Sequence, residues 1–334
     1  MTNLKPRRSF LVSLMRMKSL NVFFIFLLLF IIFAVFSPGN RFLSRDNIEI
    51  FLSTAAEFGI ISLAVGILMI AGEFDLSVGS ILAFCSLSFM KLFNSGINVV
   101  AAIVLTVIIG GMIGLLNGII TVKAQIPSFI TTLGGLLMWR GITLFWSKGL
   151  QEGLDLTKIP LTYKVIGGSK LSVIPIQFIW LVGIALVILF LMNYHKFGNW
   201  VYVTGDNKLA AKAMGISTDR IKTICFIVVG AAVGFAAVMQ MFRSGTFTAR
   251  AGDGWELNAV AASVVGGTAL SGGIGNMAGV FWGTLVISLI ENGLVLMRIQ
   301  YWWTFTVFGV VIIASVIISK IIEKHRMMMG AEIT

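Results

Sequence analysis

Residues 97–121 read Ile-Asn-Val-Val-Ala-Ala-Ile-Val-Leu-Thr-Val-Ile-Ile-Gly-Gly-Met-Ile-Gly-Leu-Leu-Asn-Gly-Ile-Ile-Thr. No Asp, Glu, Lys or Arg interrupts this stretch, which is longer than the roughly 20 residues that a helix needs to cross a bilayer. Similar apolar runs fill most of the chain, which is 57% hydrophobic and 12% charged. Soluble domains carry about 25% charged residues. The sequence therefore predicts an all-α polytopic membrane protein.

About ten transmembrane helices are expected. The first apolar run follows five basic residues, and Lys and Arg collect on the cytoplasmic side. With an even number of crossings, the N- and C-termini are both expected in the cytoplasm. No small-residue cleavage site follows the first run, so we expect it to stay as a helix. The predicted crossings are residues 20–36, 50–71, 77–93, 97–121, 127–147, 176–194, 222–242, 257–273, 276–296 and 302–320.

The whole chain, residues 1–334, is thus expected to form a single transmembrane domain. Its predicted parts are a cytoplasmic N-terminus (1–19), a membrane bundle (20–320) that includes a cytoplasmic segment at 195–221, and a cytoplasmic tail (321–334). The net charge of +11 would suggest nucleic-acid binding in a soluble protein, but here it fits the positive-inside rule.

Several kinds of chemistry are not expected in this chain. Its two cysteines, Cys85 and Cys225, both fall in apolar runs, and no cluster of His and Cys residues suggests a metal site. No Gly-x-x-x-x-Gly-Lys-Ser/Thr loop is present to hold phosphates. We therefore expect no catalytic residue, no metal and no cofactor of its own.

An internal repeat links two predicted crossings. Gly110, Gly114 and Gly118 recur as Gly275, Gly279 and Gly283, an offset of 165 residues, with Met at the third position of both segments. These are the fourth and ninth crossings, which run in opposite directions. The pattern predicts a five-plus-five inverted repeat, as in many transporters. The alternative is that Gly-x-x-x-Gly only marks close helix packing.

One polar segment, Thr204 to Lys222, lies between long apolar runs. Asp206 or Asn207 can cap a helix over Lys208 to Met214, and Gly215 is a plausible stop. An ordinary basic loop is the alternative interpretation, but such a loop needs neither a cap nor a fixed Gly. We therefore expect a docking helix outside the membrane, with site residues Asn207, Ala210, Ala211, Gly215, Ile216 and Arg220.

Two other segments place polar groups among apolar ones. Residues 72–80 carry Glu73, Asp75 and Ser77, and ionisable groups at membrane depth usually face a partner or a wet path. The alternative is a helix N-terminus capped by Asp75 or Ser77; a hydrolase with paired carboxylates has no other support. Residues 256–283 predict a short broken helix, the kind of element that lines transport routes.

The broken segment contains Gly273-x-Gly275-x-x-Ala278, but no βαβ unit surrounds it, so a dinucleotide fingerprint is excluded. Aromatic residues near the outer mouth, Trp255 and Phe247, could stack on sugars, although interfacial packing is the alternative. Trp139 and Arg140 are interpreted as interfacial anchors near a helix end. The full set of gate or pathway candidates is Glu73, Asp75, Ser77, Trp255, Glu256, Asn258, Thr268 and Ser271.

Three motifs together resemble the permease subunits of bacterial ABC importers for ribose and related monosaccharides. Residues 72–79 look like that family's Gly-Glu-Ile-Asp-Leu-Ser-Val-Gly, with Phe74 in place of Ile. Residues 256–275 are similar to its Glu-Leu-Asp-Ala-Ile-Ala-Ala run, with Asn258 in place of Asp and Ile274 in place of a later Arg. Residues 205–216 match its Gly-x-Asn-x-x-Ala-Ala-x-x-x-Gly-Ile coupling segment.

The resemblance implies a second permease subunit, identical or different, two cytoplasmic ATPases that bind ATP and Mg²⁺, and a periplasmic sugar-binding protein. It also implies a multi-pass protein of the bacterial inner membrane that imports a monosaccharide. A sister permease for branched-chain amino acids, nucleosides or a furanosyl signal molecule would share this architecture. An ion-coupled secondary transporter is the alternative of another class, and it would need no docking helix.

Overall fold

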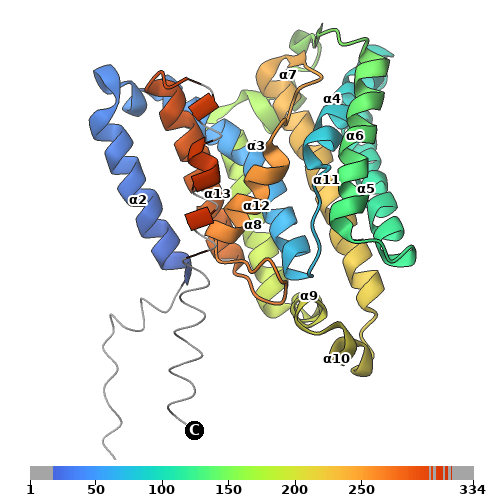
Figure 1. The fold of residues 1–334 in the computed structure, drawn as a ribbon. Coiled ribbons are helices and arrows are strands. Elements are labelled where there is room, and N and C mark those ends of the chain that lie inside the picture. The colour runs from blue at the N-terminus through green and yellow to red at the C-terminus, as the bar shows by residue number, and fades with distance from the viewer. Residues whose placement is uncertain (1–17, 301, 304–305, 311–312, 315–316, 318–334) are drawn as a thin grey trace, which may run out of the picture.

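The computed structural model describes residues 18–300, 302–303, 306–310, 313–314 and 317 (Figure 1). These residues form a bundle of helices, in agreement with the predicted class. The long helices are α2 (Lys18–Phe36), α3 (Arg45–Ile70), α4 (Val78–Asn94), α5 (Val99–Lys123), α6 (Ser128–Ser147), α8 (Ile176–Tyr194), α11 (Thr218–Ser244) and α13 (Met277–Leu296). The shorter ones are α7 (Pro160–Tyr163), α9 (Lys196–Asp206), α10 (Lys208–Ala213) and α12 (Trp255–Val265).

Within the part of the chain that the structure describes, six helices are long and apolar enough to cross a membrane: α3, α5, α6, α8, α11 and α13. Helices α2 and α4 contain shorter apolar stretches. All eight lie where the sequence predicts crossings. The crossing predicted at 257–273 is wrong as a continuous helix, because α12 ends at Val265. Its 11 residues extend only about 16 Å. Gly267, Gly272 and Gly273 all have positive φ angles that a helix cannot contain. Most of the crossing predicted at 302–320 lies outside the described residues.

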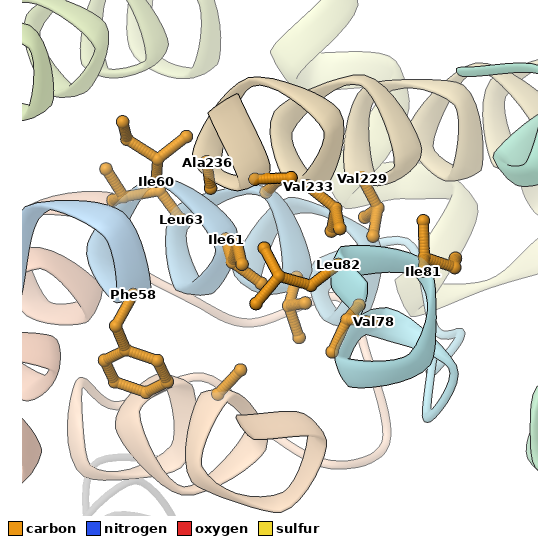
Figure 2. Close-up of a cluster of buried hydrophobic side chains, with 14 of the residues drawn as sticks. Phe58, Ile60, Ile61, Leu63, Val78, Ile81, Leu82, Val229, Val233 and Ala236 are labelled. Atoms are coloured by element: carbon orange, nitrogen blue, oxygen red, sulfur yellow. The ribbon is translucent and has the colours of Figure 1, made fainter. Parts of the chain in front are cut away.

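The core of the bundle lies between α3, α4 and α11. Almost every side chain of α3 from Ala55 to Ile70 is buried, so this helix is apolar on all sides and central. Helices at the periphery instead expose apolar side chains, such as Leu137 and Phe145 on α6 and Leu186 on α8, as expected for surfaces in contact with lipid. Figure 2 shows the core side chains Ile60, Ile61 and Leu63 of α3, Val78, Ile81 and Leu82 of α4, and Val229, Val233 and Ala236 of α11.

Glycines bring two helix pairs into backbone contact, as the sequence predicts. A Cβ atom on Gly110 or Gly114 of α5 would overlap the carbonyl oxygen of Gly230 or Phe226 on α11, respectively. Gly279 and Gly283 of α13 approach the carbonyl oxygens of Gly266 and Ala262, at the end of α12, equally closely. Gly118 is less crowded: its added Cβ would lie 3.1 Å from Thr223 Cα. Gly275 differs from the prediction, since it lies in the loop before α13 and packs on the side chain of Ile70.

The bundle has two distinct ends. Helices α9 and α10 lie together at one end, called here the α10 end, and α7 lies at the other, the α7 end (Figure 1). The α7 end also carries two short antiparallel pairs: β1 (Glu152–Gly153) with β4 (Thr246–Phe247), and β2 (Lys170–Leu171) with β3 (Ile174–Pro175). The connections also include a kinked 3₁₀ segment, η1 (Pro38–Leu43), a single 3₁₀ turn, η2 (Leu156–Lys158), and a π-helical turn, η3 (Lys164–Gly168).

Candidate functional site

The first candidate site is the capped helix at the α10 end. The Asn207 side chain accepts hydrogen bonds from the backbone N–H groups of Leu209 and Ala210, each at 3.0 Å. Gly215 ends the helix with φ +79°, and Ile216 N donates to Ala211 O at 3.0 Å. These bonds satisfy backbone groups that a helix end leaves without partners. The predicted cap, helix and glycine stop are therefore confirmed.

The surface of α10 combines apolar and basic groups. Leu209 is 80% exposed and Met214 is 62% exposed, and Lys208 reaches Asp219 at 3.4 Å. Among the predicted coupling residues, Asn207, Ala210, Gly215 and Arg220 are exposed, Ile216 is half-buried and Ala211 is buried. A depression beside the helix is lined by Lys212, Gly215, Ile216, Ser217, Thr218 and Asp219. Exposed apolar side chains with charged neighbours are typical of a contact surface.

The second candidate site begins at the loop between α3 and α4. Asp75 is fully buried and accepts from Ser77 N at 2.8 Å, from Ser77 Oγ at 2.5 Å and from Asn117 Nδ2 at 3.4 Å. Glu73 instead pairs with Lys222 of α11 at 2.5 Å. Both carboxylates of this loop thus have protein partners, which favours a structural role for Asp75 at the turn into α4. Ser77, the residue before the helix, makes no side-chain capping bond of its own. Sequence reasoning missed both Asn117 and Lys222, which lie far from the loop in the chain.

A second loop enters the bundle from the α7 end, between β4 and α12. Arg140 of α6 donates to the carbonyl oxygens of Ala249 and Ala251 and pairs with Asp253 at 2.7 Å. Arg140 lies twelve residues after the first residue of α6, Ser128, about 18 Å along the helix. It is therefore in the interior of the membrane-spanning helix, and its interpretation as an interfacial anchor is wrong. It holds the loop at that depth.

The loop between β4 and α12 meets the start of α4 at the centre of the bundle. A Cβ atom on Gly79, in the first turn of α4, would lie 2.7 Å from Glu256 Oε2 and would overlap Gly252 O. From this contact α4 runs to the α7 end, where Lys91 pairs with Glu152. Helix α12 runs the other way, and Gly273 beyond its end bonds to Ile70 at the end of α3. Two helix N-termini, each with a partial positive charge, therefore lie close together at the centre.

The remaining pathway candidates lie at different places. Trp255 packs edge-on against Phe58, with ring centroids 5.6 Å apart. Glu256 and Asn258 follow on α12 and are partly exposed, whereas Ser271 is exposed and Thr268 is buried near the α10 end. The pathway interpretation of Phe247 is not supported in this conformation, since Phe247 is fully buried in the short β4 strand. The central groups can hydrogen-bond a polar solute, but they do not form a nucleophile–base pair.

Comparison with known proteins gives a consistent result. The family described as "Branched-chain amino acid transport system / permease component" matches residues 47–316. The xylose/arabinose import permease protein XylH of Sulfolobus acidocaldarius is 33% identical over 84% of this chain and 79% of its own length. The ribose import permease protein RbsC of Escherichia coli K12 is 29% identical, over 88% and 91%. The autoinducer 2 import system permease protein LsrC of Escherichia coli SMS-3-5 is 30% identical, over 84% and 82%.

Proposed function

This chain belongs to the permease family that matches residues 47–316, and we propose that it is the membrane subunit of an ATP-driven importer for a ribose-like pentose or a related sugar. Its relatives are named for the import of xylose and arabinose, ribose, and autoinducer 2. The chain is a multi-pass membrane protein and not an enzyme, since ATP hydrolysis belongs to a separate subunit. A periplasmic binding protein would deliver the sugar to the α7 end.

The capped helix α10 is the observation that carries this proposal. It lies outside the apolar bundle and exposes Leu209 and Met214 beside basic side chains. Exposed apolar side chains beside charges favour a protein contact, and a cytoplasmic ATPase subunit that binds ATP and Mg²⁺ is the partner that the family supplies. The coupling role of Asn207, Ala210, Ala211, Gly215, Ile216 and Arg220 is part of the proposal.

The proposed topology places the α10 end in the cytoplasm of a bacterial cell, with ten crossings in the inner membrane and both termini inside. Packing supports the inverted repeat. Helix α4 contacts α5 and α11, while α12 contacts α13 and α3 in the corresponding way. Both helices begin at the Gly79–Gly252 contact and run in opposite directions. The segments 71–94 and 246–266 are therefore proposed to be equivalent parts of two halves.

The proposed sugar path runs along the outer side of the central loops. The side chain of Arg250 is 91% exposed and that of Asp253 is 50% exposed. Both lie in a loop that Arg140 holds at the depth of the middle of α6. Charged groups at such depth do not face lipid. They are therefore proposed to face a path completed by a second permease subunit, identical or different, with Trp255, Glu256 and Asn258 along its wall.

Uptake measurements test the proposal. The chain is co-expressed with its ATPase and binding protein, purified as a complex and placed in proteoliposomes with labelled D-ribose, D-xylose or L-arabinose. We expect the ATPase to co-purify and uptake of one of these sugars to require ATP. Uptake that persists without ATP and follows a proton or sodium gradient would instead establish a secondary transporter.

A second candidate substrate class comes from the family's description, which names branched-chain amino acids. The same assay with labelled leucine separates the two classes. ATP-dependent leucine uptake without sugar uptake would support an ATP-driven importer whose substrate is an amino acid and not a sugar. The binding protein is expected to set this choice, because a permease needs little affinity of its own to be shifted between two states.

Gly215→Asp is expected to abolish ATPase assembly or coupling while membrane insertion stays intact. The residue has φ +79° and open space around it, so Asp adds about 1–2 kcal/mol of backbone strain and a negative charge beside the depression on α10. Gly149→Asp is the matched control, because Gly149 has φ +69° and equally open surroundings at the α7 end. ATPase co-purification and uptake are measured for both variants. Normal sugar uptake by the Gly215 variant would contradict a coupling role.

A further inference from the structure

The end of α9 touches two loops at a single point. A Cβ atom on Gly205 would overlap the carbonyl oxygen of Ile70, at the end of α3, and would lie 2.7 Å from the backbone nitrogen of Gly273. Gly273 N itself donates to Ile70 O at 2.9 Å. Three backbone segments from α3, α9 and the α12–α13 loop therefore meet where no side chain fits.

Adjacent glycines extend the contact on both sides. A Cβ atom on Gly272 would lie 2.7 Å from Gly72 Cα, and one on Gly273 would lie 2.6 Å from Asp206 Cα. Gly272 and Gly273 have φ angles of +82° and +71°, a region that other residues rarely adopt. The sequence Gly272-Gly273 is thus required both for its backbone conformation and for its closeness to Gly72 and Asp206.

Side chains reinforce the same junction. Tyr202 of α9 donates from Oη to Gly275 O at 3.1 Å, and burial raises the pKa of Tyr202, so the phenol stays protonated as a donor. Lys222, at the start of α11, pairs with Glu73 at 2.5 Å, and these side chains are only 11% and 14% exposed. The segments on either side of α10 are therefore attached to the α3–α4 loop, and α9 is also attached to the α12–α13 loop.

Each of these two loops is joined directly to a helix that starts at the centre of the bundle. Residues 71–77 lead into α4, and residues 266–276 follow α12, the two helices whose starts meet at Gly79 and Gly252. At its other side α9 continues through Asn207 directly into α10. We propose that Gly205 is a positioning residue that transmits movement of α10 to both loops at once, so that one ATPase contact moves α4 and α12 together. The proposal rests on the coupling role of α10 proposed above.

The test is Gly205→Ala in the complete complex with its ATPase and binding protein. ATP hydrolysis and uptake of labelled D-ribose or D-xylose are measured in the same proteoliposomes, and their ratio is the readout. An added methyl group must separate α9 from Ile70 and Gly273, so we expect sugar transported per ATP to fall at least about tenfold, within the range of typical coupling energies. ATPase co-purification and the rate of ATP hydrolysis should stay unchanged.

Gly183→Ala in α8 is the matched control, since its added Cβ would meet nothing within 4 Å and its transport ratio should equal that of the unmodified complex. An unchanged ratio in Gly205→Ala, or an equal loss in Gly183→Ala, would overturn the proposal. Loss of the ATPase from the Gly205→Ala complex would also overturn it, because Gly205 would then support docking. If the unmodified complex transports without ATP, the proposed function fails instead, whatever Gly205 does.

A charge exchange tests the second attachment without crowding the backbone. Glu73→Lys and Lys222→Glu each place like charges together in a nearly enclosed site, and each is expected to lower the transport ratio. The double variant restores an ion pair and should recover the ratio. Failure of the double variant to recover, with the complex intact, would show that the α3–α4 loop is not moved through this attachment.

Discussion

Arg243→Ala is expected to cause a large loss of stability of the bundle. Arg243, at the end of α11, donates from Nε and Nη2 to the two carboxylate oxygens of Glu57 on α3, at 2.7 and 2.9 Å. The Glu57 side chain is 0% exposed, so removing Arg243 leaves a buried carboxylate without its counter-ion. Breaking a buried pair in this way costs about 3–5 kcal/mol.

The reverse truncation, Glu57→Ala, should cost less. The Arg243 side chain remains 32% exposed, so the guanidinium can recover part of its hydration. A double variant, Glu57→Leu with Arg243→Met, removes both charges and should be more stable than either single alanine variant, because apolar replacements of a buried pair are often neutral or stabilising. Thermal midpoints of the purified chain in detergent check this order. A double variant less stable than Arg243→Ala would contradict it.

This ion pair also shows which part of the structure the sequence could not predict. Glu57 and Arg243 are 186 residues apart, and each lies in or near an apolar run that predicts a crossing and says nothing of the partner helix. The same holds for Lys222 with Glu73 and for Arg140 with Asp253. Burial of a charge in the membrane implies that a partner exists. Its identity depends on tertiary packing.

Local signals were more informative. The cap at Asn207 and the glycine stop at Gly215 depend only on neighbouring residues, and the structure has both. Hydropathy wrongly predicted one continuous helix over residues 257–273, because it measures how apolar a stretch is and does not show where a helix ends. The Gly266-Gly267 pair, which ends α12, was the sequence signal that could have corrected this expectation.

For Asp75, the sequence allowed two interpretations, a gate and a helix cap. A carboxylate beside apolar runs is compatible with a gate and with a cap, since both need donors around the charge. The structure supplies these donors from Ser77 and from Asn117, 42 residues away. Glycine patterns were the clearest long-range signal. Their spacing predicted close helix contacts, and Gly110 and Gly114 lie against α11 as expected.

Gly114→Leu is expected to prevent the bundle from packing. The backbones of α5 and α11 touch at Gly114, where an added Cβ atom would overlap Phe226 O. Because the backbone fixes the position of Cβ, no rotamer of a larger side chain can relieve this overlap. Membrane helices associate through this kind of close packing. Overpacking commonly costs about 1–3 kcal/mol and sometimes more, and we expect the upper end or beyond here, because neither backbone can move without shifting the whole helix.

The position of each glycine along α5 predicts a graded series. Gly114→Ala should already lower the thermal midpoint strongly, whereas Gly118→Ala should cost less, because its Cβ would lie 3.1 Å from Thr223 Cα and 3.2 Å from Phe226 Cβ. Gly134→Leu on α6 is the matched control for Gly114→Leu: its Cβ would meet nothing within 4 Å, and replacing a helical glycine gains about 0.5–1 kcal/mol in propensity. Midpoints from size-exclusion chromatography after heating rank the variants. Equal losses for Gly114→Leu and Gly134→Leu would show that the membrane, and not the α5–α11 contact, limits the size of these residues.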